Sequence, residues 1–186
     1  MAPVEKSSTI CAQNRLLLTP PHLALCGSSF ISLLCALPIT RGAGIFQPDL
    51  DNTLEFLARE HAWLHLYPEG FVHPPDNPAE IQRCRPGIGR LVAELPVAPV
   101  VVPIAHVGME LVKPWGTWLP RVAQKVTVVV GEPIDVEALV PPELRQRLVN
   151  ESEQRRRDVA LSVAAAVEDA LLRCKREAVR LHREQR

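Results

Sequence analysis

Residues 97–104 read VAPVVVPI, and residues 126–130 read VTVVV. Both runs are almost wholly apolar and rich in β-branched side chains. Such runs are typical of strands buried on both faces, as in a parallel sheet between layers of helices. The second run stops at Gly131-Glu132-Pro133, a turn signal. We therefore expect two buried strands near the middle of the chain.

Helical patterns precede these runs. Asp51 is expected to cap a helix that ends near Glu60 or His61, and Pro86 to open a second helix that Pro96 breaks. Shorter strands are expected at 37–40 and 63–67, the second ending at a Pro-Glu-Gly turn. Helices alternating with strands predict an α/β fold, with a mixed, largely parallel sheet flanked by helices.

After Pro141-Pro142 the pattern changes, since apolar residues recur every three or four positions from Leu144 to Cys174. A long amphipathic helix with a break near Asn150 is the natural interpretation. Residues 143–186 carry 11 basic and 8 acidic side chains, a net of +3, whereas residues 1–142 carry a net of −3. A solvated helix face explains this tail most simply, and attraction to an anionic membrane is the alternative.

Composition excludes several classes of protein. The chain has 186 residues, 47% of them hydrophobic and 23% charged, which suits a globular domain and not a disordered segment. The formal net charge is +0 and aromatic residues make up 4%, which argues against nucleic acid as a partner. The five cysteines are never spaced as CxxC, so neither disulfides nor a metal site is expected.

Residues 16–40 contain no charged side chain, and residues 23–37 (LALCGSSFISLLCAL) are their apolar centre. A membrane-spanning helix needs about 20 apolar residues. This run is shorter and contains Gly and Ser, so we expect a buried or membrane-surface helix instead.

Three local motifs could bind a ligand, and each has an ordinary structural explanation as well. Tyr67-Pro68-Glu69-Gly70 follows an expected strand and would place a carboxylate where α/β folds bind ligands, but Pro-Glu-Gly is also a common turn. Arg41 precedes two glycines and could bind phosphate, although loop arginines are usually only solvated. Arg83 and Arg85 lie at a helix start, where an anion could bind.

Taken together and in order, the motifs resemble the tafazzin family within the glycerolipid acyltransferase superfamily. The resemblance covers residues 36–133 and extends to the helical tail. The stretches that carry it are PITRGAGIFQ (38–47), WLHLYPEG (63–70), GIGRLVAE (87–94), PVVVPIAHVGM (99–109) and QKVTVVVGEP (124–133).

The resemblance implies a layered acyltransferase-like domain that transfers acyl chains between phospholipids and lysophospholipids, with cardiolipin remodelling at mitochondrial membranes as the family's best-known role. Tyr67, Pro68, Glu69 and Gly70 match the family's substrate-binding FPEG block, with Tyr in place of Phe. Arg41 matches an arginine near the lipid phosphate, and Pro103 lies in the block that shapes the acyl channel. No cofactor, metal or nucleotide is implied, and the partners are phospholipid, lysophospholipid and a membrane surface.

One departure is clear, because family members use a histidine with an aspartate five positions later as general base and orienting carboxylate. No histidine here has that partner: the residues five positions after His22, His61, His65, His73 and His106 are Gly27, Leu66, Gly70, Pro78 and Leu111. No catalytic residue is therefore assigned, and the chain is expected to be inactive alone. A missing or altered N-terminus is the simplest account.

This gives three expected segments: a divergent N-terminal segment (1–35), a partial acyltransferase-like domain (36–140) and a helical C-terminal tail (141–186). Two alternatives stay open. The chain could be a non-catalytic module that binds lipid or a protein partner with the same fold. It could also fold poorly, since a missing part would leave sheet edges uncovered.

Overall fold

The computed structural model describes residues 39–40, 42–60, 62–70, 81–114 and 117–185. They fall into two compact units. The first comprises the described residues up to His65 together with Leu95–Val97, and the second comprises residues 66–94 and 98–186. The apolar segment 23–37 and the first two residues of the strand expected at 37–40 lie outside the described residues, whereas residues 39–40 are described and form no strand.

Among the described residues of the first unit, the helix is α2 (Pro48–Glu60). Its first turn is held by Gln47, whose carbonyl oxygen accepts the N–H groups of Leu50 and Asp51 at 3.0 and 3.1 Å. The Gln47 side chain also bonds Thr40 N–H at 2.9 Å and thereby closes the preceding loop. The helix therefore begins three residues before the expected cap Asp51, because Pro48 suits the first helical position. Its end at Glu60 is as predicted.

No strand forms at residues 62–67. This corrects the expectation of a strand at 63–67. Trp63 is 84% exposed and its ring meets His65 edge-on at 6.4 Å, so neither side chain is covered as a sheet residue would be.

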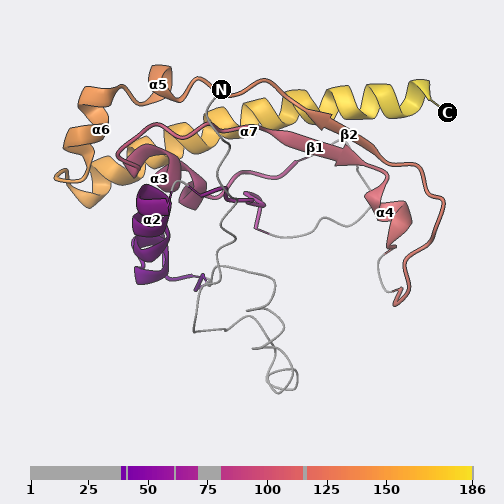
Figure 1. Cartoon of the computed structure of the whole chain (residues 1–186), viewed down its shortest axis with the longest axis horizontal. Coiled ribbons are helices and arrows are strands. Elements are labelled where there is room, and N and C mark those ends of the chain that lie inside the picture. The colour runs from indigo at the N-terminus through magenta and orange to yellow at the C-terminus, as the bar shows by residue number, and fades with distance from the viewer. Residues whose placement is uncertain (1–38, 41, 61, 71–80, 115–116, 186) are drawn as a thin grey trace, which may run out of the picture. The chain divides into compact units, whose positions relative to one another are not determined.

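The second unit is built on a long helix, α7 (Glu153–Glu184). The short helices α5 (Val136–Leu139) and α6 (Pro142–Leu148) precede it, and residues 149–152 form the break that the sequence predicts near Asn150. Ser152 caps α7 by accepting Arg155 N–H at 3.3 Å. One half of α7 packs on α3 (Pro86–Glu94), and the other half on the strands β1 (Ile104–Val107) and β2 (Thr127–Val130) (Figure 1).

The contact between α3 and α7 is unusually close. A Cβ atom on Gly89 would overlap the backbone carbonyl of Ala160, so only glycine fits at this crossing. Around it lies the main apolar core of the unit, formed by Val92, Ala93, Val136, Val140, Leu148, Val159 and Val163. The helix predicted to open at Pro86 is thus confirmed, and its apolar face is buried as expected.

Buried charges at the end of α3 are fully paired. Glu94 accepts hydrogen bonds from Arg90 Nε at 2.9 Å and from Arg156 Nε and a terminal nitrogen of Arg156 at 2.8 Å. Arg145 donates to the carbonyls of Val92 and Ala93, at 2.7 and 3.3 Å, and so satisfies the last turn of α3.

The described sheet differs from the expected one. It has two strands that pair antiparallel, with Ile104 opposite Val130 and Val107 opposite Thr127. Residues 97–103 form no ladder: Val101 makes an isolated bridge with Ile134, and the Pro103 carbonyl accepts the N–H of Gly131. Prolines 99 and 103 have no N–H to give to a ladder, which explains why the strand begins only at Ile104. A mixed helix-and-strand fold is confirmed, whereas a layered, largely parallel sheet is not found among the described residues.

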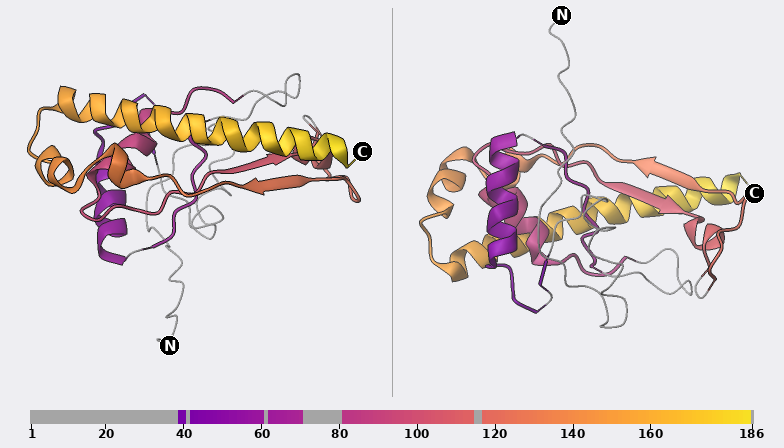
Figure 2. Two further views of the ribbon diagram at one scale, coloured as in Figure 1. Left: turned by 90° about the horizontal axis from the view of Figure 1, so that it is seen from above. Right: turned by 60° about the horizontal axis from the view of Figure 1, so that its bottom comes forward.

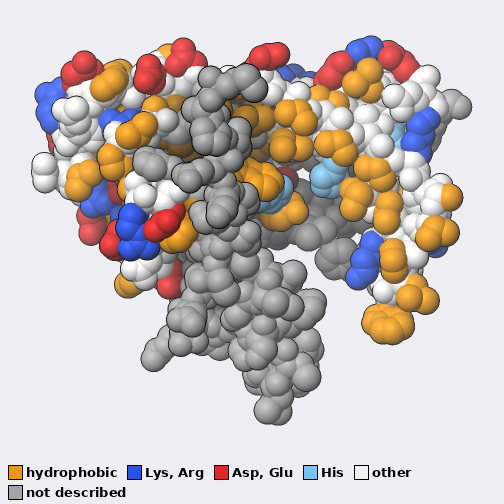
Figure 3. Space-filling model, in the orientation of Figure 1, with side chains coloured by type: hydrophobic (Ala, Val, Ile, Leu, Met, Phe, Trp, Pro, Cys, Tyr) orange, Lys and Arg blue, Asp and Glu red, His pale blue; other side chains and the backbone are white. Residues whose placement is uncertain are grey.

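Burial alternates along both strands, so only one face of the sheet is covered. Ala105 and Val107 pack with Cys174 and Ala178 of α7, which lies over this face (Figure 2). The other face is exposed, and hydrophobic side chains gather over it (Figure 3). Its exposed members are Ile104, His106, Val128 and Val130.

Replacing Gly89 by alanine tests the helix crossing. Alanine favours an isolated helix over glycine by up to about 1 kcal/mol, so propensity alone predicts stabilisation. The overlap with the Ala160 carbonyl predicts the opposite sign, a loss of about 2–4 kcal/mol in the free energy of unfolding. Urea denaturation measures the change, with exposed Ser162→Ala on α7 as the control. An unchanged or higher stability for Gly89→Ala would contradict this packing.

Cys84 offers a second test. Burial, followed by the charges of Glu168 and Glu69, raises the pKa of its thiol to about 12. Because the thiolate is the reactive form, alkylation of Cys84 by iodoacetamide at pH 8 should be at least about 100-fold slower in the folded chain than in urea. Peptide mass spectrometry after a short pulse resolves Cys84 from the other cysteines. Equal labelling in both states would mean that this core is open.

Candidate functional site

The Tyr67–Gly70 segment forms the turn that the sequence predicts. Gly70 N–H donates to the Tyr67 carbonyl at 3.1 Å, and Gly70 has a φ of 76°, a conformation that glycine adopts without strain. Tyr67 is 76% exposed, so its ring is available to a ligand.

The turn is tied to the segment just before α3. The Glu69 carboxylate accepts the backbone N–H of Gln82 at 2.7 Å, and Arg85 N–H donates to the Pro68 carbonyl at 2.7 Å. Arg85 Nε also reaches the Glu69 carbonyl at 3.4 Å. Glu69 is thus held in place while its side chain stays half-buried, a suitable state for a carboxylate that meets a ligand.

This segment is in turn tied to α7. Cys84 N–H donates to the Glu168 carboxylate at 2.8 Å, and Cys84 packs in an apolar cluster with Ala164 and Val167. The position of the Glu69 turn therefore depends on α7, which lies about 100 residues further along the chain.

A lysine that sequence reasoning missed lies near the turn. Lys175 follows Glu168 by seven residues, which places it two helical turns further along the same side of α7. Its ammonium group donates to the His106 carbonyl at 2.9 Å, leaving two of its three N–H bonds for another acceptor. It was missed because residues of an amphipathic tail look like a solvated face.

The charges here influence one another. Burial lowers the pKa of Lys175, while the carboxylates of Glu110 and then Glu69 raise it. Partial burial, followed by the Lys175 charge, lowers the pKa of His106, while the Glu110 charge raises it. The arrangement offers a carboxylate and a partly buried ammonium group, which suit the hydroxyl and phosphate groups of a ligand.

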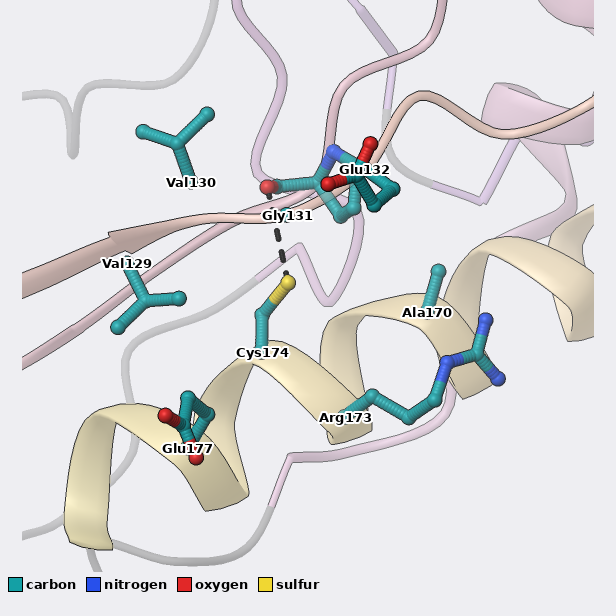
Figure 4. Close-up of a pocket in the computed structure, with 9 residues that line it drawn as sticks. Val129, Val130, Gly131, Glu132, Ala170, Arg173, Cys174 and Glu177 are labelled. Atoms are coloured by element: carbon teal, nitrogen blue, oxygen red, sulfur yellow. Dashed lines mark hydrogen bonds between the residues drawn. The ribbon is translucent and has the colours of Figure 1, made fainter. Parts of the chain in front are cut away.

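Pro103 lies elsewhere in the second unit. It is buried at the start of β1, and its carbonyl accepts Gly131 N–H at 2.9 Å and the Cys174 thiol at 3.8 Å. It lines an open hollow of about 320 Å³ (Figure 4). The other lining residues are Val129, Val130, Gly131, Glu132, Ala170, Arg173, Cys174 and Glu177. Glu69 is not among them, so Pro103 and the Glu69 turn do not share this hollow.

Other residues singled out from sequence lie outside the described residues, namely Arg41, His22, His61 and His73. Among the described histidines, His182 is buried and its Nδ1 lies 3.0 Å from Thr127 Oγ1, a structural pair. Within the described part of the chain, no three His, Cys, Asp or Glu side chains are grouped as a metal site would require.

Comparison with known proteins identifies relatives. The chain is 31% identical over 151 residues to Tafazzin from Drosophila melanogaster, covering 80% of this chain and 37% of that protein. It is 29% identical over 154 residues to Taffazin from Dictyostelium discoideum, covering 76% of this chain and 53% of that protein. It is also 39% identical over 107 residues to N-acylphosphatidylethanolamine synthase from Arabidopsis thaliana, covering 54% of this chain and 37% of that protein.

No family model and no solved structure matches the chain. The chain spans between 37% and 53% of the length of the relatives named above. The similarity to these two tafazzins extends over most of the chain. The chain belongs to the tafazzin family.

Proposed function

We propose that this chain takes part in the transfer of fatty acyl chains between phospholipids and lysophospholipids, cardiolipin among them, and that it holds the lipid rather than supplying the catalytic base. The observation that carries the proposal is the anchored Glu69 turn. Its carboxylate is fixed by Gln82, and the segment that fixes it is bonded to Glu168 of α7, two helical turns before Lys175.

Each site residue has a role in this proposal. The Glu69 carboxylate accepts a hydrogen bond from a glycerol hydroxyl of the lysolipid, and Lys175 attracts its phosphate. The exposed Tyr67 ring lies against the first part of an acyl chain. By resemblance, Arg41 contacts phosphate and Pro103 shapes the path of the acyl chain. Pro68 and Gly70 give the turn its form.

The chemistry is a direct attack of a lysolipid hydroxyl on the acyl ester of a phospholipid. The hydroxyl proton must be accepted by a base as the new ester forms, and the departing lysolipid oxygen must regain a proton. No histidine of this chain has an aspartate five positions later, so the usual pair for this task is absent from the 186 residues. No cofactor enters this reaction.

The same absence favours a second candidate function, a non-catalytic module that binds lipid or a protein partner. In both cases we place the chain at a mitochondrial membrane, attached to its surface. Among the described helices, none combines the length and apolar character needed to cross a bilayer.

Lysolipid binding tests the role of Glu69. Glu69→Gln should weaken binding of a lysophospholipid, presented below its micelle concentration, by about tenfold or more, because a hydrogen bond to a charged group is lost. Isothermal titration of the full chain measures this. Exposed Glu143→Gln in α6 makes the same charge change away from the site and should bind as the wild type does. Equal affinities for Glu69→Gln and the wild type would remove Glu69 from the site.

Acyl transfer is tested separately. The full chain is mixed with vesicles of phosphatidylcholine and a lysocardiolipin, and the products are followed by mass spectrometry. We expect no transfer above that of Glu69→Ala, since the base is absent. Transfer that Glu69→Ala abolishes would show that this chain is a complete catalyst. Lysolipid binding without transfer supports the lipid-holding role, and binding of neither lysolipid nor phospholipid would overturn it.

A further inference from the structure

The connection between α4 (Met109–Val112) and β2 exposes large apolar side chains. Trp118 is 89% exposed, Leu119 68% and Val122 87%. We name the described residues of 113–125 the Trp118 loop. Exposed apolar residues are ordinary when scattered, but three within five positions, one of them a tryptophan, form a patch that calls for a partner.

The patch is held outward by an ordered backbone. Thr117 N–H and Oγ1 both donate to the Pro114 carbonyl, at 3.1 and 2.7 Å, and Arg121 N–H donates to the Val112 carbonyl at 2.6 Å. The Lys125 ammonium group is bonded to the Gln185 carbonyl near the end of α7. Ala123 adopts a φ of 58°, which residues other than glycine rarely take. These bonds hold the backbone of the described residues on both sides of Trp118.

The charge of the loop is one-sided. Lys113, Arg121 and Lys125 are all exposed, and no acidic residue occurs between Glu110 and Glu132. Hydrophobic side chains gather at the end of the loop, with Lys and Arg side chains beside them (Figure 3). Cations around an exposed apolar tip complement a surface that is anionic outside and apolar just beneath.

We propose that the Trp118 loop is the element that docks this chain on an anionic lipid bilayer. Trp118, Leu119 and Val122 enter the interface between headgroups and acyl chains, a depth that tryptophan prefers. Lys113, Arg121 and Lys125 stay at the level of the lipid phosphates. The inference rests on the proposed function, because a protein that holds phospholipids must approach them in a bilayer.

Vesicle binding by the full chain is the test. Trp118→Ala should weaken binding to vesicles with 30% anionic lipid by about tenfold, because a large apolar group no longer leaves water. Lys113→Gln with Arg121→Gln should weaken it by about 25-fold, since each cation near the surface contributes about fivefold. For vesicles of phosphatidylcholine alone, the double variant and the wild type should bind alike. Circular dichroism confirms folding, and the matched control is Trp63→Ala, which removes an equally exposed tryptophan.

A spectroscopic readout reports insertion itself. Replacing Trp63 and Trp115 by Phe leaves Trp118 as the only tryptophan of the three. Its emission should shift to shorter wavelength on anionic vesicles and be quenched by lipids brominated near the headgroup. An unshifted, unquenched emission on bound vesicles would overturn the proposal. So would a self-association in sedimentation that Trp118→Ala abolishes, because the patch would then join two copies of the chain.

The two proposals fail separately. Trp118→Ala should leave binding of monomeric lysolipid unchanged, and Glu69→Gln should leave vesicle docking unchanged. If the wild type binds vesicles but does not bind lysolipid, the proposed function is wrong and the docking proposal stands. Equal docking by wild type, Trp118→Ala and Trp63→Ala would remove the docking loop alone.

Discussion

The close approach of α3 to α7 at Gly89 fixes the second unit. Because Gly89 has no Cβ, the Ala160 carbonyl of α7 comes against the α3 backbone, and the two helices cross nearly in contact. Cys84 lies just before α3, so this crossing brings its N–H to Glu168. The turn that carries Glu69 is bonded to the same segment. The position of residues 67–70 thus depends on α7, which packs against α3 where both helices carry small residues, Gly89 and Ala160.

Buried charges fix the position of α7 along α3. Glu94 is 8% exposed and receives two arginines, one from its own helix and one from α7, so its burial leaves no unpaired carboxylate. Sliding α7 along α3 by one turn would remove Arg156 from Glu94, leaving a buried charge without one of its partners. The apolar core tolerates such sliding poorly too, and the loss of one of the two arginines that pair with a buried carboxylate adds a further cost.

Residues that act within a few positions, such as proline, predicted the helix ends well. Contacts between residues far apart in the sequence could not be predicted in this way. Pro86, Pro96 and the break near Asn150 mark helix ends through backbone chemistry that acts within a few residues. The Val-rich runs were misleading, since an apolar sequence on both faces cannot reveal that alternate residues such as Val129 pack toward α7 while Val128 and Val130 stay exposed. Glu69 was found because its turn is local. Lys175 was not, because its bond to the His106 carbonyl spans 69 residues.

If both proposals hold, the length of α7 also sets how the Glu69 turn and the Trp118 loop can be used together. Glu168 holds the segment beside the turn, and Gln185 holds the loop through Lys125. These helical positions are 17 residues apart, or roughly 25 Å along the axis, comparable to the hydrocarbon core of a bilayer at about 30 Å. With α7 upright on the membrane, a lipid would have to leave the bilayer completely to reach Glu69. Use of both sites at once therefore requires α7 to lie nearly parallel to the membrane, with turn and loop facing the same lipids.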